Sequence, residues 1–237
     1  MFFPKELNGR RLRYSSGEYS LTFDDGPTEG VTTALGRLLR SEGISATFFV
    51  LGEHAGHEAL SELVSCGHRI GNHTFSHQNL DSFTGDHSIE IPEQIGKCHE
   101  RIESFGPRRI PFRAPGGAWS NPKFTKIANK LPFANRYIGR YGWDVDANDW
   151  RLHRKQGNRD KIEFSDFCRL FNETIDRVHR GIILLHDGFP SNEAEFADRG
   201  ENKVIQATEF VIDAIAKRGR RFVPLKEPSA LSLSTWL

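Results

Sequence analysis

The sequence has no large excess of either charge and contains little cysteine or methionine. Its 32 Lys and Arg residues and 31 Asp and Glu residues give a formal net charge of +1. The overall charge therefore gives no indication of a nucleic-acid partner. Only 1 Met but 18 Phe occur among the 237 residues, which predicts a core built on rigid aromatic rings.

The three cysteines, Cys66, Cys98 and Cys168, are far apart and form neither a C-x-x-C pair nor a disulfide framework. No apolar run approaches the length of about 20 residues that crosses a bilayer. The N-terminus has no basic segment followed by a long apolar one, as a signal peptide would. We therefore expect a protein of the reducing cytoplasm without a membrane span. The composition specifies no oligomeric state.

Apolar segments of strand length alternate with segments of helical periodicity along most of the chain. This alternation predicts an α/β fold with about seven parallel strands joined by helical crossovers. We expect a polar, irregular lead-in at residues 1–18, one domain at 19–225 and a tail at 226–237 that closes one end of the core. The strands are predicted at 19–23, 46–51, 69–71, 110–112, 136–143, 182–185 and 221–224.

Polar clusters follow the ends of several predicted strands. In a parallel sheet or barrel all carboxyl ends of the strands face one way, and that face carries the active site. Loops that were merely polar would not select His, Asp and Arg each time. The clusters contain Asp24 and Asp25, His73 and His77, Arg113, Asp149, and His186.

The adjacent carboxylates Asp24 and Asp25 repel each other unless a cation lies beside them, so a metal site is one hypothesis. A simple turn is the alternative, since Asp-Asp-Gly-Pro is a good turn sequence. His73 and His77 are four residues apart, and on a helical turn both imidazoles would lie on one face. With Asp25 they would give three ligands and an open position, as in catalytic zinc sites.

Five ordered segments resemble the motifs of the polysaccharide deacetylases, carbohydrate esterase family 4, also called the NodB-homology domain. The resemblance covers residues 19 to 225 and implies a distorted (β/α) barrel of about seven strands. It also implies a hydrolase that removes N-acetyl groups. The segments are TFDDGP at 22–27, HTFSH at 73–77, RAP at 113–115, DANDW at 146–150 and LLH at 184–186.

The resemblance implies a role for each polar cluster. Asp25, His73 and His77 would bind a divalent metal, Zn²⁺ first and Co²⁺ or another ion as alternatives. The ion would polarise the acetyl carbonyl and lower the pKa of its bound, attacking water toward about 7. Asp24 would be the general base, held ionised and oriented by Arg113.

The remaining roles concern the leaving group and the pocket. His186 would protonate the leaving amine, with Asp149 favouring its imidazolium form. A main-chain N–H near Gly116 would stabilise the oxyanion. Trp150 and Leu184 would form walls of the acetyl and sugar pocket, so these residues and Gly116 are the predicted substrate contacts.

Gly116 departs from the family pattern, which usually has an aromatic residue there. The missing ring would widen the pocket wall. Trp119 either fills that gap or packs in the core. We expect the loops at 78–90, 151–165 and 188–202 to shape the groove.

Three functions remain in view. The first is N-deacetylation of N-acetylhexosamine saccharides, with chitooligosaccharides favoured over peptidoglycan because no export signal is evident. The second keeps the same metal site but takes O-acetyl esters of the xylan type, formylated sugars or other C–N amide bonds. The third is a glycan-binding module without activity. It is disfavoured because the base, the ligands and the acid are all present.

Overall fold

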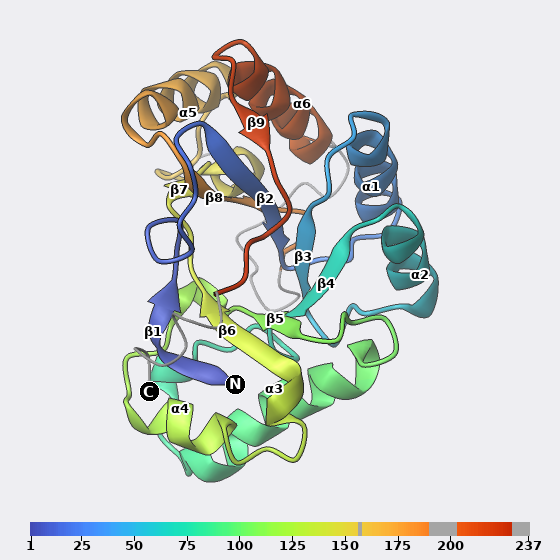
Figure 1. The fold of residues 1–237 in the computed structure, drawn as a ribbon, viewed down its shortest axis with the longest axis vertical. Coiled ribbons are helices and arrows are strands. Elements are labelled where there is room, and N and C mark those ends of the chain that lie inside the picture. Colours follow the sequence, from blue (N-terminus) through green and yellow to red (C-terminus); the bar gives the residue numbers. More distant parts are fainter. Residues whose placement is uncertain (156–157, 190–202, 229–237) are drawn as a thin grey trace.

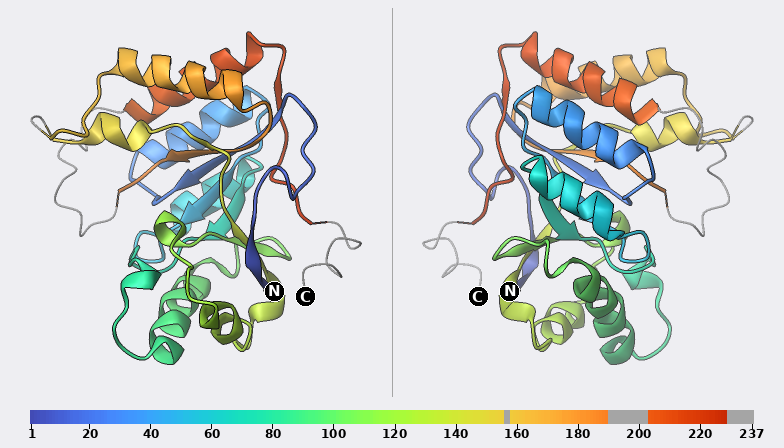
Figure 2. Two further views of the ribbon diagram at one scale, coloured as in Figure 1. Left: turned by 90° about the vertical axis from the view of Figure 1, so that its left-hand side faces the viewer. Right: turned by 90° about the vertical axis from the view of Figure 1, so that its right-hand side faces the viewer.

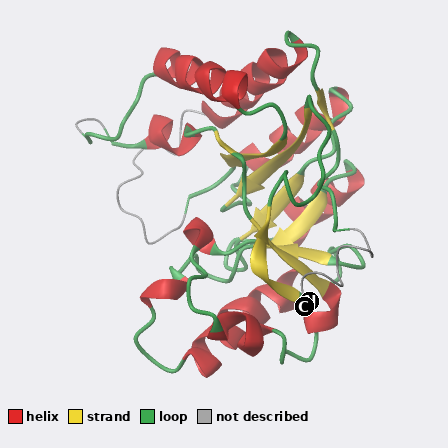
Figure 3. Ribbon diagram, turned by 60° about the vertical axis from the view of Figure 1, so that its left-hand side comes forward, coloured by secondary structure: helices red, strands yellow, loops and turns green. Residues whose placement is uncertain are grey.

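The structure is a computed structural model that describes residues 1–155, 158–189 and 203–228. Its centre is a curved sheet of parallel strands, with the helices on the outside (Figures 1 and 3). The strands are β1 (Phe2–Leu7), β2 (Glu18–Asp24), β3 (Thr47–Val50), β4 (Arg69–Asn72), β5 (Ile110–Phe112), β6 (Tyr137–Tyr141), β7 (Val145–Asp146), β8 (Gly181–His186) and β9 (Arg221–Phe222).

Eight strands follow one path in the order β1-β6-β5-β4-β3-β2-β8-β7, and β9 pairs with β2 outside it. Every strand pair among the described residues is parallel. The expected α/β fold with a distorted barrel of parallel strands is therefore confirmed. In the register of β2 with β8, Asp24 lies opposite His186, so two of the predicted clusters end neighbouring strands.

Six α-helices of the described chain connect the strands and cover the outer face of the sheet. Helices α5 and α6 lie side by side, as do α3 and α4 on the opposite side of the molecule (Figure 2). The α-helices are α1 (Val31–Ser41), α2 (His57–Ser65), α3 (His87–Ile102), α4 (Lys123–Ala128), α5 (Phe164–Arg177) and α6 (Lys203–Ala216). Short 3₁₀ helices are η1 (Leu80–Ser82), η2 (Pro115–Gly117), η3 (Ala134–Arg136) and η4 (Asp149–His153).

Side chains of neighbouring strand residues separate into two apolar clusters, because successive side chains point to opposite faces. Phe48 and Ile183 belong to the large cluster between the sheet and the helices. Their neighbours Phe49 and Ile182 belong to a smaller cluster with Tyr141 and Leu225. Both faces of the strands are thus buried, which explains why the sequence shows continuous apolar runs there.

The expectation about the N-terminal segment needs correction, and the expectation about the C-terminal tail mostly concerns residues that the structure does not describe. Residues 1–18 are not simply irregular, because Phe2–Leu7 forms β1 and pairs with β6. Phe2 is buried and packs its ring against Phe112, which explains why this short segment is ordered. The tail at 226–237 is expected to close one end of the core, but residues 229–237 lie outside the described residues. With β1 and the short strand β7, the described residues form nine strands where the sequence predicts about seven.

None of the described helices combines the length and the apolar character needed to cross a bilayer.

Candidate active site

The five predicted clusters lie together at the carboxyl ends of the strands. Asp24 ends β2, His73 follows β4, Arg113 follows β5, Asp149 begins η4 after β7, and His186 ends β8. A pocket of about 220 Å³ opens there. Its lining is Asp24, Asp25, His73, His77, Gly116, Trp143, Asp146, Trp150, Arg154, Leu184, His186 and Phe189.

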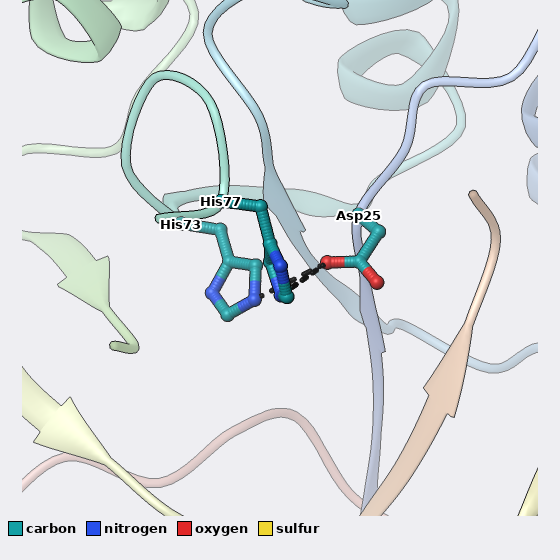
Figure 4. A group of neighbouring side chains, drawn as sticks. All are labelled: Asp25, His73 and His77. Carbon is teal, nitrogen blue, oxygen red and sulfur yellow. Dashed lines mark ion pairs between the residues drawn. The ribbon is translucent and has the colours of Figure 1, made fainter. Parts of the chain in front are cut away.

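Asp25, His73 and His77 form the one group of potential metal ligands found among the described residues (Figure 4). Oδ1 of Asp25 lies 3.3 Å from Nε2 of His73 and 3.2 Å from Nε2 of His77. One ligand atom from each residue lies within 4.8 Å of the others. The expected set of one carboxylate and two imidazoles is therefore assembled in space.

The donor atoms fit a divalent metal. Oδ1 of Asp25 is buried and has no hydrogen-bond partner, which is costly for a carboxylate oxygen unless a cation is bound. Nδ1 of His73 lies 3.0 Å from the carbonyl oxygen of Arg113. A proton donated from Nδ1 to that carbonyl leaves Nε2, on the side of Asp25, free to ligate an ion.

The ionisation of this group also suits a cation. Burial opposes the charge of Asp25, but the imidazoles of His77 and His73 outweigh it and lower the pKa of Asp25 to about 2. Burial lowers the pKa of His77 and is the largest influence on it. Burial also opposes the charge of His73, but Asp24 and Asp25 outweigh it and raise the pKa of His73. Binding of a metal would therefore displace a proton from His73, since the ligand is a neutral imidazole.

The loop that carries the two histidines is not the helical turn expected from their spacing. Thr74 and His77 have φ angles of 73° and 56°, and no helix covers residues 73–77. The side chain of Asn72 accepts the Thr74 N–H at 2.8 Å, and Gln94 of α3 accepts the N–H groups of the next two residues. These hydrogen bonds stabilise a bend that brings both imidazoles to Asp25.

Asp24 has a different environment from Asp25, although the two are adjacent. Its Oδ1 accepts a hydrogen bond from Nη1 of Arg113 at 2.7 Å. The guanidinium is fully buried, lies over the ring of Phe49 and donates further hydrogen bonds to Thr22 and the carbonyl of Gly142. Through this charge-assisted hydrogen bond Arg113 holds the Asp24 side chain in a fixed orientation.

His186 and Asp149 form a second charged pair at the pocket. Asp149 is completely buried and accepts from the main-chain N–H of His186 at 2.7 Å. Its other oxygen lies 2.9 Å from Nδ1 of His186. Burial lowers the pKa of His186, but Asp149 outweighs it and raises that pKa to about 10. His186 is therefore an imidazolium at neutral pH.

The walls of the pocket contain the three predicted contact residues and several others. Trp150, Leu184 and Gly116 all line it. A Cβ at Gly116 would meet nothing within 4 Å, so this wall is open. Trp119 does not fill the gap, because it is 5% exposed and packs against Phe112 in the core.

Trp143 and Asp146 also line the pocket, and the sequence analysis assigned neither a role. Asp146 is the second residue of the two-residue strand β7, and Trp143 lies just before this strand. A strand of two residues is too short to be recognised by its periodicity. Burial raises the pKa of Asp146, whose Oδ1 accepts the N–H of Asn148 at 2.8 Å. The recurrence of Asp and Trp in residues 143–150 is the signal that could have identified them.

A further buried acid, Asp187, does not line the pocket but lies next to the turn that carries Asp25. Burial raises its pKa to about 7, and the nearby charge of Asp25 acts in the same direction. Its side chain accepts a hydrogen bond from the N–H of Gly26, the residue after Asp25. Asp25 itself has a φ of 77°, in the left-handed region. That conformation costs a residue with a side chain about 1–2 kcal/mol, so it requires support from its surroundings.

Comparison with known proteins gives consistent similarities. A family model described as polysaccharide deacetylase matches residues 13–135. A chitooligosaccharide deacetylase of Azorhizobium caulinodans is 36% identical over 223 residues, which are 91% of this chain and 96% of the relative. A peptidoglycan-N-acetylglucosamine deacetylase of Bacillus cereus is 29% identical over 218 residues, 90% of this chain and 68% of the relative.

A solved structure is similar over nearly the whole chain as well. It is a peptidoglycan N-acetylglucosamine deacetylase in complex with a substituted benzamide, with a TM-score of 0.65 and 26% sequence identity. The match covers 90% of this chain and 87% of that one.

Proposed function

The chain belongs to the polysaccharide deacetylase family, carbohydrate esterase family 4, and from this we propose that it is a metal-dependent hydrolase removing N-acetyl groups from N-acetylhexosamine saccharides. One observation carries the proposal. A carboxylate with two imidazoles, a separate buried carboxylate and a protonated histidine surround one pocket. This set provides ligands, base and acid for hydrolysis of an amide.

Asp25, His73 and His77 would hold the ion, most simply Zn²⁺, with Co²⁺ as a substitute. Three protein ligands leave a position open, as in catalytic rather than structural sites. When bound, the metal supplies a Lewis acid for the acetyl carbonyl and for the water that hydrolyses it.

Asp24 is the proposed general base. Its Oδ1 is held by Arg113, while Oδ2 lies 3.5 Å from Nε2 of His73, on the side of the metal ligands. A carboxylate with one oxygen fixed and the other directed to the ligands can accept a proton from the attacking water. That water adds to the acetyl carbon and forms the C–O bond.

His186 is the proposed general acid. Its raised pKa keeps a proton available, and Asp149 fixes the ring through Nδ1. The tetrahedral intermediate collapses with cleavage of the C–N bond, and His186 protonates the departing nitrogen. Acetate and a free amine are the products. We propose that a main-chain N–H at Gly116 stabilises the oxyanion, since this residue lines the same pocket.

Chitooligosaccharides are the proposed substrates, since the relative that is 36% identical acts on them by name. Trp150 and Trp143 present aromatic rings, and Leu184 an apolar surface, to the acetyl group and the sugar ring. The open wall at Gly116 supports a second candidate. The same residues would act on O-acetyl esters or formylated sugars, because more than one acyl group fits a wider pocket.

The test is release of acetate and free amine from N-acetylglucosamine oligomers of two to six units. Protein stripped with a chelator is assayed before and after addition of Zn²⁺ or Co²⁺. We expect release that depends on the metal. Acetyl xylan, N-formylglucosamine and peptidoglycan fragments form the comparison panel. Preference for an ester would replace the first candidate by the second, and no release from any substrate by metal-loaded protein would contradict both.

A further inference from the structure

The conformation of Asp25 depends on hydrogen bonds made by its backbone and by that of Gly26. On the side of β3, the N–H of Asp25 donates to the carbonyl of Phe49 at 3.3 Å. The carbonyl of Gly26 accepts the N–H of Leu51 at 3.0 Å. Nδ1 of His54 lies 3.2 Å from the carbonyl oxygen of Asp25. Three of these backbone groups are therefore held from one side of the turn.

The fourth group, the N–H of Gly26, is held from the other side by Asp187. Strands β2 and β8 are parallel neighbours (Figure 1). Their register pairs Asp24 with His186, so the residues after that pair lie side by side. The main-chain N–H of Asp187 donates to the carbonyl of Asp24 at 3.1 Å. Its side-chain Oδ1 accepts the N–H of Gly26 at 3.2 Å.

The other oxygen of Asp187 connects this turn to α1. Oδ2 accepts the hydroxyl proton of Thr32 at 2.5 Å. The Thr32 oxygen in turn accepts the N–H of Thr28 at 2.7 Å, so the hydroxyl both donates and accepts. Both oxygens of Asp187 are thus acceptors, one for the turn and one for the helix, and both Asp187 and Thr32 are buried.

The fit around this carboxylate is tight. A Cβ on Gly26 would lie 2.0 Å from Oδ2 of Asp187. A Cβ on Gly188 would lie 2.6 Å from the carbonyl oxygen of Asp25. Glycine is therefore required at both places, and the carboxylate of Asp187 contacts the backbone that follows Asp25 directly.

We infer that Asp187, supported by Thr32, is a positioning residue that fixes the metal ligand Asp25 through the backbone of Gly26. This inference rests on the proposed function, since it assigns Asp187 to the same metal site. Asp187 does not touch the proposed ion. It acts by restricting the turn to the one conformation in which the Asp25 carboxylate points to His73 and His77.

The variant Asp187→Asn has nearly the same shape but replaces one acceptor by an NH₂ donor. Whichever way the amide is turned, either the N–H of Gly26 or the hydroxyl of Thr32 loses its acceptor. Mutation of a residue that orients a metal ligand without touching the metal typically lowers metal affinity by about 10–100-fold. We expect a loss of Zn²⁺ affinity in this range.

Asp144 offers a matched control at the other end of β8. Its Oδ2 also accepts two hydrogen bonds, from the N–H of Gly9 at 2.7 Å and of Ile182 at 2.9 Å. Asp144 does not line the pocket. The variant Asp144→Asn makes the same replacement of a buried carboxylate by an amide, but its amide oxygen can take the place of Oδ2 and keep both hydrogen bonds. It therefore controls for loss of the carboxylate charge alone, and its Zn²⁺ dissociation constant should stay within about twofold of wild type.

The experiment starts from the metal-free full chain and measures its Zn²⁺ affinity by competition with a chromophoric chelator. The absorption spectrum of bound Co²⁺ is recorded for each variant. The melting temperature is measured without metal. Thr32→Val should weaken Zn²⁺ binding in the same direction as Asp187→Asn, and Thr32→Ser should restore it. Both weakened variants should show an altered Co²⁺ spectrum, since the ligand geometry changes. Thr32→Val provides the test should Asp187→Asn fail to fold.

Wild-type affinity in the folded variants would overturn the inference and leave the proposed function in place. An equal loss of affinity in Asp144→Asn would also overturn it, since the effect would then be one of lost carboxylate charge. Failure of the wild-type protein to bind Zn²⁺ or Co²⁺ would instead overturn the proposed metal site itself.

Discussion

The two ends of the sheet place charged groups in different circumstances. At the amino ends of the strands, Glu18 begins β2 and receives Arg221 and Lys226, each with an N–O distance of 2.6 Å. Arg69 begins β4 and pairs with Glu227 at 2.8 Å. These pairs join segments distant in sequence, and each charged group in them has a partner of opposite charge. This end connects β2 and β4 to residues 221–227.

At the carboxyl ends Asp24 pairs with Arg113 and Asp149 pairs with His186, but some buried polar atoms there have no hydrogen-bond partner. Oδ1 of Asp25 has no hydrogen bond, and three residues, Asp25, Thr74 and His77, have left-handed backbone angles. Backbone strain and a buried carboxylate oxygen without a hydrogen bond lower stability, and such features persist where they serve function. The comparison predicts that substitutions at the carboxyl end alter chemistry, while those at the amino end alter stability alone.

The largest expected effect is that of Asp24→Asn, since it removes the proposed base and keeps its shape. We expect kcat for acetate release to fall on the order of 10²–10⁴-fold. The Zn²⁺ dissociation constant should change little, because Asp24 is not one of the three ligands. Assays of kcat and metal content on the same preparation check both. Near-normal turnover would show that Asp24 is not the base.

The second largest effect is expected for Asp149→Asn, which tests the proposed acid His186 through the pH dependence of kcat/KM. Asp149 raises the pKa of His186 to about 10, so the protonated acid persists at high pH. Without the carboxylate, that pKa should move toward about 6.5, the ordinary value for histidine. The basic limb of kcat/KM should then move to lower pH, with activity at pH 8 reduced roughly 30-fold by loss of protonated His186.

The exposed variant Asp166→Asn on α5 serves as the control for this profile, because Asp166 pairs with Arg169 away from the pocket. Its basic limb should coincide with that of wild type. If the basic limb of the kcat/KM profile is unchanged in Asp149→Asn, His186 is not the general acid.

A smaller effect is expected for Gly116→Ala, which separates strain from space at the pocket wall. The added Cβ meets nothing within 4 Å, but the φ of 54° disfavours any side chain. Stability should fall by about 1 kcal/mol, with turnover within about twofold of wild type. Gly117→Ala, at φ 70°, is the matched variant. Urea denaturation of both should give similar losses, whereas a large loss of activity in Gly116→Ala would show that this wall contacts the substrate closely.

The smallest effect on chemistry belongs to Glu18→Gln at the amino end. Lys226 and Arg221 lower the pKa of Glu18 from 4.5 to about 2. A depressed pKa stabilises the fold above pH 4.5, and this contribution is lost as pH falls toward 2. The melting temperature of Glu18→Gln should therefore be below that of wild type at pH 7, and the difference should disappear near pH 2. Activity should not change. A change in kcat would contradict the division between the two ends.

Several elements could be predicted because their signals are local. The apolar run around Phe48 and Phe49 predicts β3, and the helical spacing of Leu35 and Leu39 predicts α1. Strand β1 could not be predicted in this way, since its order depends on pairing with β6 and on the contact of Phe2 with Phe112. Both partners lie more than 100 residues away.

Which residues are available for chemistry, and their position after strand ends, could be predicted from the amino-acid sequence. This is possible because strand periodicity and motif spacing are local properties. The meeting of Asp25 with His73 and His77, through a left-handed turn and a bend rather than a helical turn, depends on the folded chain. The place of Asp187 beside this turn also depends on the folded chain, because the pairing of β2 with β8 joins residues about 160 positions apart.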